Sequence, residues 1–231
     1  MPNNDNSKQT PSREVLVREG QIRGESRLPA AAVILIAIVL QLRVPESLSV
    51  GPSYIVPVFA GLLLVPLLVL NHHRFTPQSR DLKGISITLL AAMNIGNVSS
   101  VALLLRRLLN GSKVNGRTLI FSASEIWFTG VIVVGLWLWE LDRGGPIDRS
   151  AGKCVDPDLL FAQMSDHTLT SKPWSPTLVD YLYVSLTNST AFSPTDTLPL
   201  RTRTKLLMAV QSVASLATIA VLGARAVNIL R

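Results

Sequence analysis

Five long blocks of apolar residues constrain this chain more than any other feature. They are Leu28–Leu42, Tyr54–Leu70, Leu82–Leu105, Leu119–Leu141 and Leu206–Leu230. A soluble core would spread its apolar residues at helix or strand period, with polar residues between them. Most of these blocks instead approach or exceed the roughly 20 residues that cross the ~30 Å hydrocarbon layer as a helix. The sequence therefore predicts an all-α fold, an integral membrane helical bundle with five strong transmembrane helices.

The first block is the shortest of the five. Leu28–Leu42 crosses only if its helix continues past Arg43, whose long side chain can reach the membrane interface. A cleaved signal peptide is the alternative, but the mostly polar residues 1–27 precede the block and no clear cleavage site follows it. We interpret it as a retained helix. Only 16% of the chain is charged, against about 25% in an average soluble domain, which agrees with a chain that lies largely in lipid.

The polar stretches divide the chain into four regions. Residues 1–27 mix amides, hydroxyls and alternating charges, and we expect a flexible cytoplasmic tail. Residues 28–141 hold the first four apolar blocks and form a four-helix transmembrane region. Residues 142–176 are rich in glycine, proline and aspartate and form an extramembranous connection. Residues 177–231 hold a pore-like segment and the final transmembrane helix.

Basic residues predict the orientation. The net charge is +7, but lysine and arginine lie mainly at the ends of the apolar blocks, where they meet phosphate headgroups, so we expect no nucleic-acid partner. Five precede the first block, three lie in 71–83, four in 106–117 and four in 142–177. In membrane proteins the loops with more lysine and arginine residues lie on the cytoplasmic side. The count therefore predicts a multi-pass protein of the cell membrane whose amino terminus is cytoplasmic.

The sequence carries no pattern typical of an enzyme. Cys154 is the only cysteine, and no Cys/His spacing of a metal site occurs, so we expect no metal and no cofactor. Asp156 and Asp158 could act as paired carboxylates, but neither a nucleophile nor a partner base accompanies them. A turn around Pro157 is the simpler interpretation. We expect no catalytic residues.

Three polar residues within the apolar blocks are candidates for a functional or a packing role. Asn94 and Asn97 lie one helical turn apart, and their amides need partners in hydrocarbon, so we expect this face to pack on protein. Glu125 is a functional candidate, because an intramembrane carboxylate costs about 2.5–3.5 kcal/mol at the bilayer centre. An interfacial ion pair with Arg117, Arg106 or Arg107 is the alternative. We expect the tryptophans of the fourth block to be interfacial anchors; they are Trp127, Trp137 and Trp139.

Residues 178–200 combine a short apolar helix with a dense run of hydroxyl and amide residues. The apolar part, Tyr181–Leu186, is too short to cross a membrane. Irregular backbone at membrane depth must be buried in protein or line a cavity. A short helix followed by polar residues is therefore typical of a re-entrant pore helix and its loop.

The same stretch resembles the pore module of the tetrameric potassium-channel superfamily. In that family an aromatic-rich pore helix runs into a threonine-rich filter, an aspartate, a proline and the inner helix. Tyr181 and Tyr183 match the pore helix, and Asp196 and Pro199 match the aspartate and the proline. Residues 191–193, Ala-Phe-Ser, stand where the family has Gly-Tyr-Gly. The resemblance covers about the last fifth of the chain and implies an oligomer around this segment.

A second resemblance and the predicted orientation bear on the same segment. Residues 192–197 and 224–230 resemble a family of uncharacterised bacterial multi-pass membrane proteins. Five crossings with a cytoplasmic amino terminus would place a re-entrant loop on the cytoplasmic face, whereas the channel family presents its filter to the outside. Three explanations of this conflict are open: a sixth, polar crossing at Leu178–Leu198, an orientation opposite to the one predicted, or a pore analogy that does not hold. We favour the sixth crossing.

Two functions remain open. The first is a channel-like homo-oligomer in which hydroxyl oxygens and a ring of carboxylates favour monovalent cations. Its pore-lining candidates are Thr187, Ser189, Thr190, Ser193, Thr195 and Asp196. The second is a non-conducting binding or scaffolding protein in which the polar residues form interhelical hydrogen bonds. In both cases the lipid bilayer is the partner that the composition implies.

Overall fold

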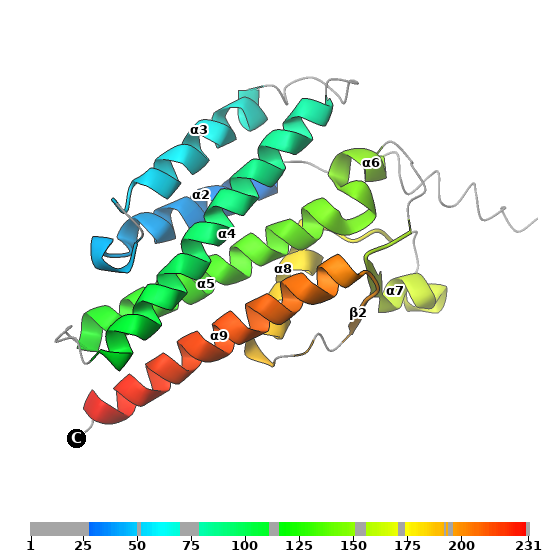
Figure 1. Ribbon diagram of the computed structural model, residues 1–231. Coiled ribbons are helices and arrows are strands. Elements are labelled where there is room, and N and C mark those ends of the chain that lie inside the picture. The colour runs from blue at the N-terminus through cyan, green and yellow to red at the C-terminus, as the bar shows by residue number, and fades with distance from the viewer. Residues whose placement is uncertain are drawn as a thin grey trace, which may run out of the picture.

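Five long helices form the bundle in a computed structural model of the chain. The structure describes residues 28–49, 52–69, 79–110, 116–150, 156–170, 174–191, 193 and 196–229. The long helices are α2 (Leu28–Arg43), α3 (Ile55–Val69), α4 (Ser79–Leu109), α5 (Gly116–Leu141) and α9 (Thr202–Ile229). Consecutive members run in opposite directions (Figure 1). Each apolar block of the sequence therefore forms a helix, because an uninterrupted apolar run buries its backbone polar groups best as a helix.

Smaller elements gather at one end of the bundle, which we call the cap end. They are η3 (Asp142–Gly144), α6 (Pro146–Ser150), β1 (Leu159–Phe161), α7 (Ala162–Ser165), η4 (His167–Leu169) and β2 (Thr197–Pro199). A further 3-10 helix, η1 (Glu46–Leu48), follows α2, and α8 (Leu178–Thr190) is a short helix beside α5 and α9. The all-α prediction is confirmed, with a two-stranded sheet added. Strands of three residues are too short to show a period in the sequence.

The five helices differ in length. Within the described residues, three stretches are long and apolar enough to cross a membrane: Lys83–Leu109, Gly116–Gly144 and Thr202–Ala224. Helix α2 has 16 residues and α3 has 15. At 1.5 Å per residue these two helices measure roughly 22–24 Å, less than the ~30 Å hydrocarbon layer. Among the described residues three helices are thus long enough to cross a membrane, where the sequence predicted five.

Helix α5 lies at the centre of the bundle. It contacts α2, α4, α8 and α9, and more than half of its candidate span is buried inside the protein. Val133, Leu136 and Leu138 are almost fully buried in the main core. A second core, near the other end, joins α5 to α4 and α9 through Leu104, Ile126 and Val221. Helix α5 therefore positions the four helices that pack against it.

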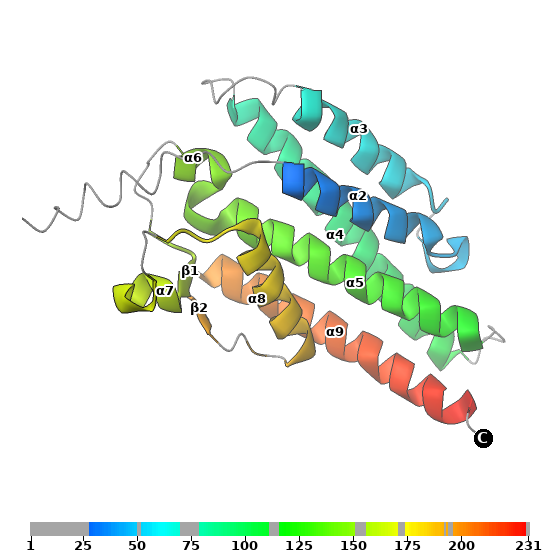
Figure 2. The same cartoon turned by 180° about the vertical axis from the view of Figure 1, so that it is seen from behind.

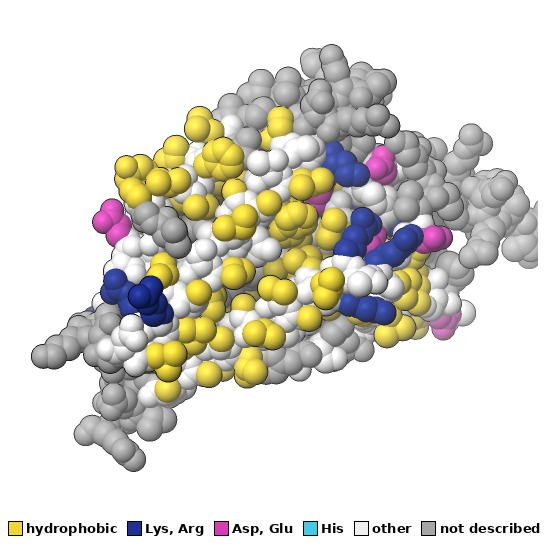
Figure 3. Space-filling model, in the orientation of Figure 1, with side chains coloured by type: hydrophobic (Ala, Val, Ile, Leu, Met, Phe, Trp, Pro, Cys, Tyr) yellow, Lys and Arg dark blue, Asp and Glu magenta, His cyan; other side chains and the backbone are white. Residues whose placement is uncertain are grey.

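The outer surface agrees with a lipid environment. Apolar side chains cover the middle of the molecule over α3, α4 and α9, and charged side chains gather toward the two ends (Figure 3). Large apolar side chains such as Leu62, Ile95 and Val213 are mostly exposed. A soluble monomer rarely exposes an apolar surface of this extent.

Candidate functional site

Helix α8 enters the bundle from the cap end and the chain returns to the same end. The helix begins there with a capping box, in which the Thr177 backbone N–H donates to the Asp180 carboxylate at 2.7 Å. After the helix the chain turns back, and β2 pairs antiparallel with β1, so that Leu160 lies opposite Leu198 (Figure 2). The segment is therefore re-entrant within the bundle. The sixth crossing that we favoured is wrong, because the Tyr181–Asp142 hydrogen bond holds the start of the segment at the cap end and the pairing of β2 with β1 holds its end there.

One face of α8 is polar and buried against α9. Ser185, Asn188 and Ser189, spaced three and four residues apart, share this face. Gln211 of α9 is buried among them: its Nε2 donates to Ser185 Oγ at 2.6 Å and to Ser189 Oγ at 2.8 Å. Its Oε1 accepts from Asn188 Nδ2 at 2.8 Å. A single glutamine thus forms hydrogen bonds with three buried polar side chains. Without these hydrogen bonds, burial of the three polar groups would destabilise the fold.

The same network reaches α5. The Ser185 hydroxyl also donates to the Val131 carbonyl at 2.7 Å. The Ser215 hydroxyl of α9 donates to the Ser189 carbonyl at 2.6 Å and accepts from Trp127 Nε1 at 2.6 Å. Hydrogen bonds therefore connect all three helices of the α5–α8–α9 module.

Helices α5 and α8 meet at a glycine. A Cβ atom placed on Gly135 would lie 2.7 Å from Leu182 Cδ2 and 3.1 Å from Leu182 Cα. The second distance involves backbone, which cannot rotate away. Only glycine allows α8 to approach α5 this closely.

The predicted pore-lining residues fall into three environments. Ser189 lies in the interior, bonded to Gln211. The Thr187 and Thr190 hydroxyls donate to carbonyls of their own helix, at 3.1 Å to Tyr183 and 2.9 Å to Leu186. Beyond the helix, Ser193 and Asp196 are exposed, and Thr195 lies outside the described residues. Within the described part, the side chains most accessible to an ion are therefore in the loop after α8.

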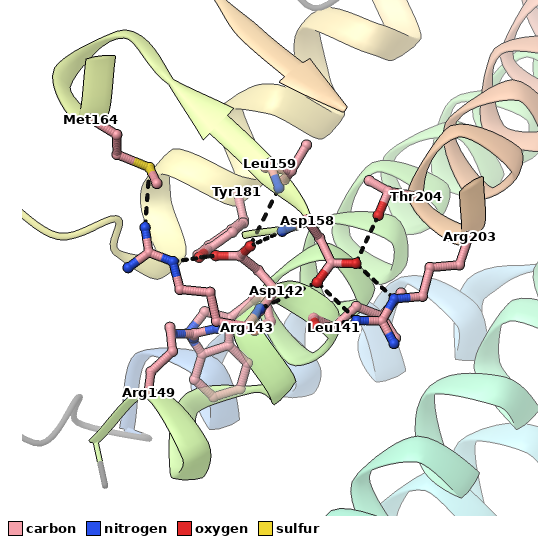
Figure 4. A network of polar contacts seen from close by, with 11 residues as sticks. Leu141, Asp142, Arg143, Arg149, Asp158, Leu159, Met164, Tyr181, Arg203 and Thr204 are labelled. Carbon is pink, nitrogen blue, oxygen red and sulfur yellow. Dashed lines mark hydrogen bonds and ion pairs between the residues drawn. The ribbon is translucent and has the colours of Figure 1, made fainter. Parts of the chain in front are cut away.

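A network of charged side chains anchors this module at the cap end (Figure 4). Asp142, at the end of α5, is fully buried and accepts a 2.6 Å hydrogen bond from the Tyr181 hydroxyl of α8. It also accepts from the backbone N–H groups of Asp158 at 2.8 Å and Leu159 at 3.3 Å. One carboxylate therefore connects α5, α8 and β1.

Asp158 forms the second centre of the network and connects it to α9. Its carboxylate accepts two hydrogen bonds from Arg203, from Nε at 2.7 Å and from Nη2 at 2.8 Å. The Thr204 hydroxyl donates to the same carboxylate at 3.4 Å. Such a bidentate pair is planar and directional. The turn that we expected at Pro157 therefore carries a buried, fully paired carboxylate.

Arg149 completes the network from α6. It is buried, and its Nη1 donates to the carbonyls of Trp139 at 2.8 Å and Asp142 at 2.7 Å. Its guanidinium lies over the rings of Trp139 and Tyr181, at 5.9 Å and 5.4 Å from their centres. The cation is therefore compensated by carbonyl oxygens and aromatic faces. Among the described residues, no group of three or more His, Cys, Asp or Glu side chains could hold a metal ion.

The intramembrane candidates lie around a small cavity between α4, α5 and α9. Asn97 is buried, and its Nδ2 would lie 3.0 Å from a Cβ atom placed on Gly130 of α5. Asn94 is half-buried and lines the same cavity, whose volume is about 30 Å³. This volume holds about one water molecule. Asn97 thus lies against α5, and Asn94 lines the space between the helices.

Glu125 and the tryptophans are placed differently from expectation. Glu125 is half-buried, and Arg43 at the end of α2 is close enough to act on it electrostatically. Trp139 is buried, and Trp127 donates to Ser215 inside the bundle. Trp139 is thus a core residue, and Trp127 is a partly buried residue that joins two helices through its indole N–H.

Sequence reasoning missed the residues that organise the site. Gln211 lies within the last apolar block, where an isolated glutamine at membrane depth is a signal of helix pairing. Asp142, Arg149 and Arg203 lie outside the apolar blocks and have no comparable signal. The hydrogen bonds that they form across the site join residues between 7 and 62 positions apart in the chain.

Comparison with known proteins identifies no related protein. No family model matches the chain, and no curated protein or solved structure is significantly similar to it. The function must therefore be argued from the geometry of the α5–α8–α9 module.

Proposed function

We propose that this chain is a multi-pass protein of the cell membrane that assembles into a channel-like homo-oligomer for monovalent cations. One observation carries the proposal: α8 enters the bundle from the cap end, and the chain returns to that end before α9. A full-length helix, a half-length helix, a loop and a second full-length helix are the parts from which re-entrant pore modules are built. Irregular backbone at this depth must line a cavity or be covered by protein.

The loop after α8 is the part of this module that we assign to the ion path. The hydroxyls of Ser189, Thr187 and Thr190 have partners within the subunit. Ser193 and Asp196 are exposed beyond the end of the helix. In an oligomer a ring of Asp196 carboxylates would concentrate cations at the entrance of the path.

Exposed apolar side chains support an oligomer. Val179, Tyr183 and Leu186 project from the outer face of α8 and are 70%, 54% and 38% exposed. A re-entrant helix with such a face needs lipid or another subunit beside it. We propose that neighbouring copies cover this face.

We further propose that α2 and α3 complete five crossings and that the cap end is cytoplasmic. Lys83, near the start of α4, donates to the Gly144 carbonyl at 2.8 Å, so the start of α4 and the residues that follow α5 lie at the same end of the bundle. The excess of lysine and arginine marks the cytoplasmic side. With this orientation α8 enters from the cytoplasm, opposite to the potassium-channel family. The proposal therefore depends on the geometry of the module and not on the orientation of that family.

A non-conducting binding or scaffolding protein is the second candidate. It is favoured by the hydrogen bonds of Ser185, Asn188 and Ser189, which are all formed inside one subunit with Gln211. In this case α8 acts as a plug that fixes the bundle. We assign no catalytic role and no cofactor, because the carboxylates of Asp142 and Asp158 are occupied by structural partners.

Ion flux through the purified protein decides between the two candidates. Protein reconstituted in liposomes should carry K⁺ or Na⁺ down an imposed gradient, with the rate proportional to protein density. Liposomes with heat-denatured protein serve as the control. If native protein carries neither ion over a range of voltage and pH, the channel proposal is wrong and the scaffolding function replaces it.

A further inference from the structure

A second cavity lies on the opposite face of α4 from the first and is lined by none of the α5, α8 or α9 residues. It occupies about 330 Å³ between α2, the loop that contains η1, the start of α3 and the middle of α4. This volume lies within the range of small-molecule sites, roughly 300–1,000 Å³. The cavity is therefore large enough to hold part of a lipid or another small amphipathic molecule.

Gln41 places an amide on the wall of this cavity. The residue is 7% exposed, and its Oε1 accepts no hydrogen bond within the described residues. A buried amide oxygen without a hydrogen-bond partner destabilises a fold, so packing alone does not explain this residue. The site is thus polar and unsatisfied as it stands.

Helix α4 is shaped to receive this amide. A Cβ atom placed on Gly96 would lie 2.8 Å from Gln41 Nε2 and 3.2 Å from the methyl groups of Val56. A glycine is therefore required at this position for the glutamine to lie against α4.

The remaining wall is neutral and amphipathic. Four serine hydroxyls line the cavity, from Ser49, Ser53, Ser99 and Ser100. Apolar side chains complete the wall, among them Phe59 and Ile95, which are 42% and 68% exposed on the outer surface. None of the described lining residues is charged. The cavity thus opens toward the apolar outer surface and offers hydroxyls and one amide inside.

We propose that this cavity binds a neutral lipid that carries a free hydroxyl group, of the diacylglycerol type. A hydroxyl both donates and accepts, so it can satisfy either end of the Gln41 amide, whichever way the amide is turned. A charged headgroup would lose its hydration without meeting an opposite charge. The Gln41 amide lies against Gly96, at the middle of α4, where an uncharged hydroxyl is buried at lower cost than a charged headgroup.

This inference is independent of ion conduction and is tested by ligand-dependent stability. The probes are dioctanoylglycerol and its acetate ester, which has the same chains but no free hydroxyl. The thermal unfolding midpoint of the full chain in detergent micelles should rise with dioctanoylglycerol concentration, and rise less with the ester. An equal rise with both probes, or no rise with either, would overturn the proposal.

Gln41→Leu is the deciding variant. Loss of one hydrogen bond should weaken dioctanoylglycerol binding roughly five- to tenfold and remove the preference over the ester. Without a probe, this variant should be as stable as the wild type or more stable, because it removes an unsatisfied amide. A variant that is destabilised without the probe, or that keeps the preference, would show that the amide serves the fold instead.

Two further variants control the experiment. Gln163→Leu makes the same chemical change in α7 at the cap end and should keep the wild-type response to both probes. Ala92→Phe places a ring in the cavity wall and should abolish the response to both. If Ala92→Phe responded like the wild type, the lipid would bind elsewhere.

Discussion

The Tyr181 hydroxyl donates a 2.6 Å hydrogen bond to the buried Asp142 carboxylate, and this bond ties the start of α8 to the end of α5. The two residues are 39 positions apart in the chain. Their contact, together with the bidentate Arg203 pair on Asp158, fixes where the re-entrant segment begins and where α9 starts. The cap network thus determines the geometry of the α5–α8–α9 module.

Tyr181→Phe should destabilise the protein by about 1.5–3 kcal/mol, the usual contribution of a hydrogen bond to a charged group. The ring still fills its place, so the loss reports the hydroxyl alone. Thermal unfolding in detergent measures it. Tyr183→Phe, on the exposed face of the same helix, is the matched control and should change little. Equal effects of the two substitutions would show that the Asp142 contact has no special role.

Gln211→Leu should lower stability by about 2 kcal/mol. The substitution removes several interhelical hydrogen bonds, which average about 0.6 kcal/mol each in membrane proteins. It contrasts with Gln41→Leu, which removes an amide without a partner and should not destabilise. Both variants are compared by unfolding in the same detergent. If they behave alike, the network around Gln211 does not hold α8 in place.

Gly135→Ala should destabilise by about 1–3 kcal/mol, because its new Cβ would press on the Leu182 backbone. Gly61→Ala in α3 is the control, since no atom lies within 4 Å of a Cβ placed there. That control should be neutral or stabilising by up to about 1 kcal/mol through helix propensity. A neutral result for Gly135→Ala would mean that α8 lies farther from α5 than described.

Asp196→Asn should reduce cation flux about tenfold at low ionic strength, because the carboxylate concentrates cations near the path. The reduction should shrink as salt increases. Asp156→Asn is the control: it removes an exposed carboxylate of the cap that pairs with Arg201 at 3.2 Å. If both variants retain the wild-type flux, Asp196 does not contribute to an ion path.

The cap end should face the cytoplasm. After Cys154 is replaced by serine, Thr168→Cys in the cap should resist an impermeant thiol reagent in intact cells and react after lysis. Asn110→Cys, at the far end of α4, should react in intact cells. Both positions are exposed in the structure. Reversed labelling would invert the orientation, and equal labelling of both would mean that the chain does not separate them across a membrane.

The sequence by itself determined the helices and their order. Leu119–Leu141, for example, forms α5, since hydrocarbon requires a continuous apolar run and internally paired backbone, and both are local properties. The amides of Asn94 and Asn97 were also predictable, because an amide at membrane depth needs protein beside it.

Only the tertiary structure decided the rest. The re-entrant course of α8, the buried carboxylates of Asp142 and Asp158, and the unsatisfied amide of Gln41 depend on partners far along the chain. Lys83 and Asp148, 65 positions apart, lie 3.3 Å from each other. A local sequence pattern indicates which residues need a hydrogen-bond partner when they lie in lipid. Which partner they find depends on how the helices pack, and packing is a property of the whole chain.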